Sequence, residues 1–158
     1  MKSERKYSLL EAKARLEALC AYQERCSFEL IKKMNLWFID REDQDRLLAE
    51  LISTNFLNEE RFAAAFTSGR TRIKRWGKIK IRVELKKKMI SNYSIDKALK
   101  GIDLDEYWAN LIHLAQRKWD LSNENDPFKK KMKLYRFLNT KGYEADLIKD
   151  AVEEISKS

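Results

Sequence analysis

Residues 78–90 read KIKIRVELKKKMI, and the fold class depends on the conformation of this stretch. Between Ile79 and Leu85, apolar and charged residues alternate without a break, which is the pattern of a half-buried β-strand. Taken alone, the stretch would be assigned as a strand. The spacing of apolar residues elsewhere in the chain tests that assignment.

A repeated apolar spacing favours a helix instead. Two apolar residues four positions apart, followed by a third fourteen positions later, occur three times along the chain. The first and last copies lie in FELIKKMNLW (28–37) and FKKKMKLYRFL (128–138), which have helical spacing, so the middle copy predicts a helix over 78–90 with Met89 facing inward. The three sets are Leu30, Met34 and Leu48; Ile81, Leu85 and Leu99; and Leu134, Leu138 and Val152.

The predicted helix over 78–90 has a second apolar face. At about 100° per residue, Ile79, Val83 and Ile90 lie roughly opposite the inward residues. A helix with two apolar faces requires two partners, so we expect one face to pack inside its own bundle and the other against a neighbouring unit.

The composition also favours helices. The chain is 44% hydrophobic and 37% charged, and its four glycines and one proline leave few helix breakers. Ser8 with Glu11 forms a capping-box signal, Asp126-Pro127 marks another helix start, and a helix that begins after Asn58 is expected to end at Trp76-Gly77. The sequence predicts an all-α protein of three tandem three-helix repeats, forming an elongated, curved helical array with repeats at 1–55, 56–101 and 102–158.

The positive charge of the chain is concentrated in residues 69–90, which we call the basic segment. It holds ten Lys or Arg and one acid, Glu84, while the whole chain of 158 residues has a net charge of +8. A local excess of this size indicates a polyanionic partner or an acidic protein surface. The candidate binding residues are Arg70, Arg72, Lys74, Arg75, Trp76, Lys78, Lys80, Arg82, Lys86, Lys87 and Lys88.

A solvated charged face is the alternative for this segment. The cations at 70–75 end a predicted helix, where they complement the helix dipole. Like charges four residues apart on a helix repel each other, which favours a partner. The pairs are Lys74 and Lys78, Lys78 and Arg82, and Arg82 and Lys86. Trp76 has two interpretations, stacking on an exposed base or plugging the space between two helices.

A second basic cluster follows Pro127, where positive charge opposes the helix dipole. It either extends the first surface or is a solvated face. Because residues 40–60 and 144–154 are rich in acids, any nucleic-acid surface should be one-sided. The cluster consists of Lys129, Lys130, Lys131 and Lys133.

Nothing in the sequence suggests catalysis or a metal. His113 is the only histidine and has no ligand or paired carboxylate at a catalytic spacing, so we expect no enzyme, metal or cofactor. Cys20 and Cys26 are expected to be buried thiols rather than a disulfide or metal pair. The sequence has no secretory or membrane-spanning apolar stretch, which predicts a cytoplasmic protein with no membrane partner.

Two motifs resemble the RecX family, whose members regulate the bacterial recombinase RecA. The first is the run NFLNEERFAAAF at 55–66, followed by Ser68 to Arg70, and the second is GKIKIRVEL at 77–85. With the third-repeat segment, including Lys141-Gly142-Tyr143, the similarity covers nearly the whole chain. The sequence departs from it at Phe38-Ile39-Asp40, where many relatives have a glycine, which leaves the conformation of that loop open.

The resemblance implies three tandem three-helix repeats and a non-enzymatic function. Family members lie in the groove of the RecA filament on single-stranded DNA and inhibit its ATPase, strand exchange and filament growth. The expected partners are the RecA filament and single-stranded DNA, with double-stranded DNA as a further candidate, and the expected state is a monomer.

Two other functions fit the sequence. A stand-alone helical DNA-binding protein, similar to a helix-turn-helix regulator, would read DNA with the helix over 78–90. An RNA-associated or ribosome-associated protein is favoured only if that stretch is a strand.

Overall fold

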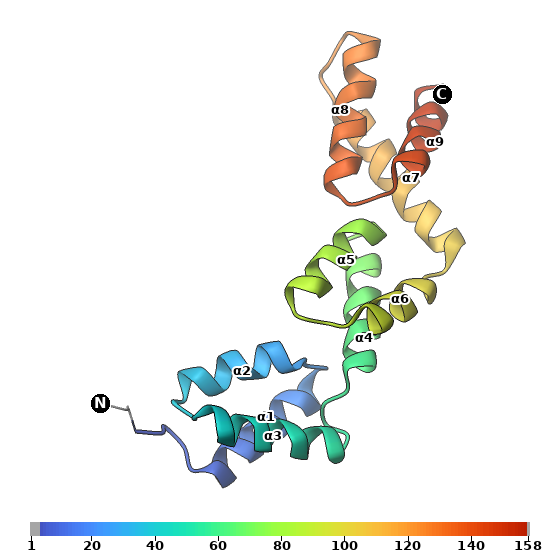
Figure 1. Ribbon diagram of the computed structural model, residues 1–158. Coiled ribbons are helices and arrows are strands. Elements are labelled where there is room, and N and C mark those ends of the chain that lie inside the picture. The colour runs from blue at the N-terminus through green and yellow to red at the C-terminus, as the bar shows by residue number, and fades with distance from the viewer. Residues whose placement is uncertain (1–3, 158) are drawn as a thin grey trace.

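The structure is a computed structural model that describes residues 4–157, and these residues form nine α-helices and no strand (Figure 1). The predicted all-α class with three consecutive three-helix units is confirmed. The repeat boundaries at 55/56 and 101/102 stay predictions. The helices are α1 (Leu9–Tyr22), α2 (Ser27–Leu36) and α3 (Arg41–Ser53) in unit 1; α4 (Glu59–Arg72), α5 (Lys78–Lys87) and α6 (Asn92–Lys100) in unit 2; and α7 (Leu104–Leu121), α8 (Pro127–Thr140) and α9 (Ala145–Ser156) in unit 3.

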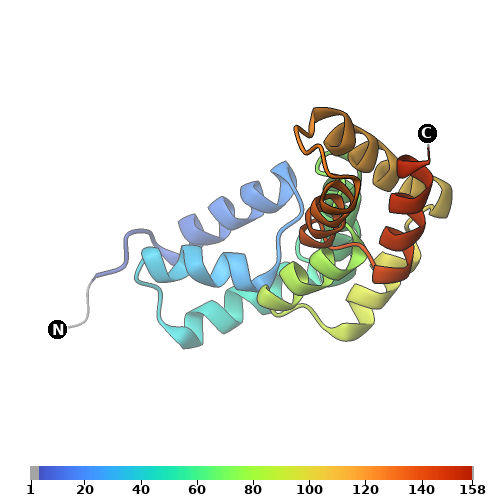
Figure 2. The same ribbon diagram turned by 90° about the horizontal axis from the view of Figure 1, so that it is seen from above.

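The three units follow one another along an elongated array, with unit 1 at one end and unit 3 at the other (Figure 1). Seen from above, unit 1 lies to one side of units 2 and 3 (Figure 2). The extensive helix–helix contacts all lie within units, and each unit has its own cluster of buried apolar residues. Each unit therefore folds around its own small core, and the junctions between units set their relative positions.

The repeated apolar spacing marks the cores of the three units. All nine residues of the three sets are at most 9% exposed. Four positions after the second residue of each set, the chain takes a left-handed conformation, at Phe38 (φ 57°), Met89 (φ 63°) and Gly142 (φ 88°). The next residue in each unit is buried: Ile39, Ile90 and Tyr143.

The loop at Phe38 therefore keeps a glycine-like conformation without a glycine. A left-handed non-glycine residue costs about 1–2 kcal/mol, and the burial of Ile39 and the cap by Asp40, whose side chain accepts from the amide of Asp43 at 3.0 Å, offset this cost.

The ambiguous stretch is helix α5, as the repeat spacing predicts, but two expectations about its side chains were wrong. Met89 is 78% exposed, because α5 ends at Lys87 and the left-handed Met89 leaves the helical face. Ile79 and Val83 are 50% and 46% exposed, so the neighbouring unit does not bury this face as expected. Ile90 does pack inward, but in the core of unit 2 itself.

Helix α4 is shorter than predicted. It ends at Arg72 rather than at Trp76-Gly77, and Arg75 takes a left-handed conformation (φ 54°) in the turn that follows. Lys74 and Arg75 therefore lie in a turn. Lys74 shares no helix with Lys78, while Lys78, Arg82 and Lys86 do lie on one helix at the predicted four-residue spacing.

Units 2 and 3 meet through a backbone contact between two glycines. A Cβ on Gly77 would lie 2.3 Å from the carbonyl carbon of Gly142, and a Cβ on Gly142 would lie 2.3 Å from the Cβ of Lys80. The amide of Gly77 donates to the carbonyl of Lys141 at 2.7 Å, and the amide of Ile79 donates to that of Gly142 at 2.9 Å. The turn between α8 and α9 thus caps the start of α5, which has no side-chain cap of its own.

Two tyrosines of unit 3 complete this junction. The Tyr107 hydroxyl accepts from the amide of Lys78 at 2.8 Å and donates to Glu144, and the Tyr143 hydroxyl donates to the carbonyl of Arg75 at 2.8 Å. Burial raises the pKa of both hydroxyls well above the ordinary tyrosine value, and the bond to Glu144 adds to the rise at Tyr107. Both phenols therefore stay protonated hydrogen-bond donors at neutral pH.

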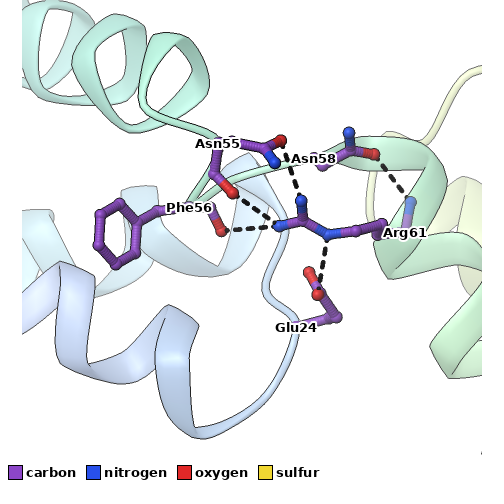
Figure 3. Close-up of polar contacts among 5 residues, drawn as sticks. All are labelled: Glu24, Asn55, Phe56, Asn58 and Arg61. Carbon is purple, nitrogen blue, oxygen red and sulfur yellow. Dashed lines mark hydrogen bonds and ion pairs between the residues drawn. The ribbon is translucent and has the colours of Figure 1, made fainter.

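Units 1 and 2 are joined by Arg61 at the start of α4 (Figure 3). Its guanidinium donates to Glu24 at 2.9 Å and to the side chain and the backbone carbonyl of Asn55, both at 2.9 Å. A longer bond of 3.4 Å reaches the carbonyl of Phe56. One side chain of unit 2 thus holds both the α1–α2 loop and the connection after α3.

A second contact between these units involves the cysteines. The prediction that both are buried thiols is confirmed, and burial raises the pKa of each. Cys26 stands between α1 and α2 but packs into the core of unit 2. Close to it, Lys88 of unit 2 pairs with Glu29 of unit 1 at 3.2 Å.

No helix among residues 4–157 is long and apolar enough to cross a membrane. Within the same residues no group of three or more His, Cys, Asp or Glu could hold a metal ion. His113 lies on an exposed part of α7.

The glycine contact predicts a large difference between two glycine-to-alanine variants. Gly142→Ala places a methyl group against Lys80 in a left-handed residue, so we expect it to lower the free energy of unfolding by at least about 2 kcal/mol. Gly69→Ala is the matched control, because nothing lies within 4 Å of its added Cβ inside α4, and it should raise stability by up to about 1 kcal/mol. Urea unfolding followed by circular dichroism measures both, and equal effects would contradict the role of the contact.

The Arg61 contacts predict that Arg61→Lys loosens unit 1 from unit 2. One ammonium group cannot reach all the acceptors of the guanidinium, so the loss of stability should be about 1–3 kcal/mol, with faster proteolysis around residues 54–58. Arg46→Lys is the control, because the one ion pair of Arg46 among the described residues is an exposed pair with Glu42, so the change should alter stability by less than about 0.5 kcal/mol. Unchanged proteolysis in Arg61→Lys would argue against a clamp.

Candidate functional site

The basic segment runs through the end of α4, the turn at 73–77 and the whole of α5 (Figure 1). The structure divides its ten cations by what they contact within the described residues. Four are paired with carboxylates, four lie over aromatic rings, and two have neither kind of partner. These groups differ in how easily they can serve a ligand.

The four paired cations come from different parts of the segment. Arg82 and Asp96 are 2.8 Å apart, and Arg72 and Glu106 are 3.7 Å apart. Lys87 pairs with Glu84 at 3.2 Å, while Lys88 pairs with Glu29 of unit 1. Exposed pairs contribute only about 0–1 kcal/mol, so a polyanion can compete for them. Lys88 is the exception, because its side chain is only 25% exposed and joins two units.

Three cations surround the ring of Trp76 and, with Phe66, form what we call the cation–aromatic cluster. Lys80, Arg70 and Lys74 lie 4.6, 5.3 and 5.4 Å from its centroid, and Arg70 also lies 4.3 Å from that of Phe66. Trp76 is half-buried and packs against the core of unit 2, as a plug between helices would. Its stacking on a base stays a prediction, as does binding by the cations.

The remaining three cations all lie in unit 2, Arg75 and Lys78 at the junction with unit 3 and Lys86 in the last turn of α5. Lys78 is 5.2 Å from the ring centroid of Tyr107. Arg75 is half-buried, and within residues 4–157 its Nε has no hydrogen-bond partner. Lys86 is exposed and, in the described part of the chain, has no carboxylate within ion-pair distance.

The second basic cluster lies apart from the basic segment. The first turn of α8 is at the end of unit 3 that points away from unit 2 (Figure 1), so the length of α8, about 20 Å for its 14 residues at 1.5 Å each, separates it from the junction. Lys130 lies 4.0 Å from the ring centroid of Trp119, Lys133 pairs with Glu124 at 3.5 Å, and Lys129 and Lys131 are exposed. Its role stays a prediction.

Reasoning from the sequence missed the carboxylates that hold the cations and the exposed aliphatic residues beside them. Asp96 and Glu106 are distant in sequence from Arg82 and Arg72, and no local pattern reveals these pairs. For Ile79 and Val83 there was a signal: they lie on the helical face opposite Ile81 and Leu85. The surface therefore combines positive charge with apolar groups, which suits binding rather than proton transfer.

The Arg82–Asp96 pair predicts that an internal carboxylate competes with a polyanion. Asp96→Asn frees Arg82, so this variant should bind heparin up to about fivefold more tightly and elute at higher salt. Asp150→Asn on α9 is the control, because it makes the same change in net charge away from the basic segment. Equal shifts in the two variants would show that only net charge matters.

Two family models match this chain, and both describe three-helix domains of RecX. The model for RecX, second three-helix domain, matches residues 58–99, and that for RecX, third three-helix domain, matches residues 105–152. These ranges cover units 2 and 3, including the basic segment.

Curated relatives give the same result. The chain is 38% identical over 124 residues to "Regulatory protein RecX" of Clostridium botulinum (strain Alaska E43 / Type E3), which covers 77% of this chain and 58% of the relative. It is 30% identical over 140 residues to "Regulatory protein RecX" of Chlorobium phaeobacteroides (strain BS1), which covers 89% of this chain and 90% of the relative. The chain thus spans less than two thirds of the length of the Clostridium relative.

Solved structures agree on the fold. The crystal structure of RecX from Lactobacillus salivarius superposes with a TM-score of 0.82 at 19% identity and covers 95% of this chain and 97% of that one. A crystal structure of another regulatory protein RecX gives a TM-score of 0.83 at 21% identity and covers 95% of this chain and 73% of that one. With the identity to the Chlorobium relative over nearly both whole chains, the chain belongs to the RecX family.

Proposed function

We propose that this protein regulates the RecA recombinase by binding the RecA filament on single-stranded DNA, without catalysing a reaction, and that it inhibits ATP hydrolysis, strand exchange and filament growth. The observation that carries the proposal is membership of a family whose curated members are named regulatory proteins. The location of the basic segment in unit 2 supports it.

The charge distribution supports a filament as the target. The basic segment and the second basic cluster lie on different units of one array, and each offers several exposed cations. When a monomer is bound to a polymer at one place, its second contact forms at a high effective concentration. A free RecA subunit offers only one place to bind. Phosphates of single-stranded DNA and acidic protein groups are both suitable ligands for these cations.

A stand-alone DNA-binding protein that reads the duplex with α5 is less well supported. Base readout uses bidentate Arg, Asn or Gln side chains. The most exposed side chains of α5 are Ile79, Val83, Lys86 and Lys87, which suit phosphate and apolar contacts. Tight, sequence-selective binding to duplex DNA without RecA would favour this alternative.

The first test is the DNA-dependent ATPase activity of RecA with this protein added at less than one copy per RecA subunit. We expect hydrolysis to fall and filaments to shorten in electron micrographs, because one bound copy blocks the addition of further subunits. Unchanged hydrolysis together with unchanged filament length would contradict the proposal.

Three lysines of the basic segment should carry the electrostatic part of the inhibition. Lys74→Gln, Lys78→Gln and Lys86→Gln combined remove cations that have no carboxylate partner among residues 4–157. The change at Lys78 removes a positive charge from the start of α5, so helicity should be kept. If these lysines meet phosphates of single-stranded DNA, the slope of log affinity against log salt should fall by about two.

The matched control is the triple variant Lys129→Gln, Lys131→Gln and Lys133→Gln, which has the same net charge. If the first variant inhibits RecA fully and the control variant does not, the cations that inhibit RecA lie in unit 3 and not in the basic segment.

A further inference from the structure

Helix α5 exposes two aliphatic side chains in the middle of the basic segment. Ile79 and Val83 are 50% and 46% exposed and lie one turn apart, so their side chains are neighbours along the helix. The other aliphatic residues of α5, Ile81 and Leu85, are fully buried. Exposed β-branched residues at this spacing form an apolar ridge, about half of whose surface stays open to solvent.

Cations flank this ridge on both sides. At 100° per residue, Arg82 and Lys86 lie on one side of the pair, and Lys80 and Lys87 lie on the other. The ridge also forms one wall of a groove of about 410 Å³, and Leu99 and Lys100 of α6 contribute to the opposite side. An apolar strip bordered by positive charge is thus the central feature of the exposed face of α5.

The carboxylates in this groove are already engaged. Asp96 pairs with Arg82 at 2.8 Å, and Glu144 accepts the hydrogen bond of the Tyr107 hydroxyl. Lys86 and Lys100 have no carboxylate partner among the described residues. The rim therefore keeps a positive charge that an acidic ligand would neutralise.

We propose that the groove beside Ile79 and Val83 docks an acidic, apolar segment of a partner protein rather than nucleic acid. This rests on the proposed function, under which that partner is the protein surface of the RecA filament. A phosphate backbone can pair with Lys86 and Arg82 but offers nothing apolar to bury the ridge, and bases stack on aromatic rings, of which the groove presents none. A protein segment with aliphatic anchors and acidic neighbours satisfies both features.

The proposal assigns different roles to two parts of the basic segment. The groove meets protein, whereas the cation–aromatic cluster around Trp76 lies outside it. Variants of the ridge should therefore separate binding to the filament from binding to DNA alone.

The test is the double variant Ile79→Ala and Val83→Ala. Alanine has the highest helix propensity, so α5 should keep its fold, which circular dichroism and urea unfolding check. Two affinities are measured, for RecA filaments assembled on a thymidine oligonucleotide with a slowly hydrolysed ATP analogue, and for the same oligonucleotide alone. We expect the filament affinity to fall about tenfold, and to remain lowered at high salt, and the oligonucleotide affinity to change less than about twofold.

The control is Leu10→Ala with Ile52→Ala, which truncates two exposed aliphatic residues of unit 1 and should leave both affinities unchanged. If the double variant loses stability, Ile79→Val gives a smaller loss of filament affinity with less structural change.

Three results would overturn the inference. An equal loss of affinity for the bare oligonucleotide would mean that the groove meets nucleic acid, and unchanged filament affinity would mean that it is no interface. Loss of filament affinity in the unit 1 control to the same extent would mean that the effect is not specific to the ridge. If instead the unaltered protein does not bind RecA filaments, the proposed function fails first.

Discussion

The contact between Gly77 and Gly142 is the constraint on which the arrangement of units 2 and 3 depends. A Cβ on either glycine would clash with the opposing segment of the same chain. The amides of Gly77 and Ile79 at the start of α5 donate to backbone carbonyls of the turn at Gly142. The contact therefore does two things at once. It positions unit 3 against unit 2, and it starts α5, which carries five of the ten cations of the basic segment. This helix has no side-chain cap and no acid in its first turn.

Much of the fold could be predicted because it rests on burial. Ile81, Leu85 and Leu99 recur at the spacing seen in the other two units, and residues that fill equivalent core positions must be apolar, so the repeat is visible in the sequence. The local alternation around Ile79 was a weaker signal than this repeat. The assumption that the chain itself buries every apolar face was wrong, because Ile79 and Val83 stay about half exposed. The prediction that Met89 faces inward failed for a different reason. Met89 takes the left-handed conformation that usually marks a glycine, and a methionine gives no sign of it in the sequence.

The candidate site was predictable only in part. The excess of Lys and Arg is a property of composition, but the pairing of Arg82 with Asp96 and the position of Arg70 between Phe66 and Trp76 depend on how three helices pack. The same holds for Arg61, which belongs to the motif that resembles the family. Its residue type is visible in the sequence, whereas its role as a clamp on the connection from unit 1 follows from the left-handed Asn55 and from Glu24, 37 positions away.

Helix α5 illustrates why a surface so rich in like charge can persist. Repulsion between Lys78 and Arg82, and between Arg82 and Lys86, opposes helix formation by a few tenths of a kcal/mol for each pair, and a ten-residue helix is not stable alone. Its stability comes from Ile81 and Leu85 in the core and from acceptors supplied by unit 3 at its start. Because these contacts involve only the buried side and the first turn, the exposed side contributes little to folding. That side is free to combine lysines with two aliphatic residues, a combination that costs stability and solubility unless a partner covers it.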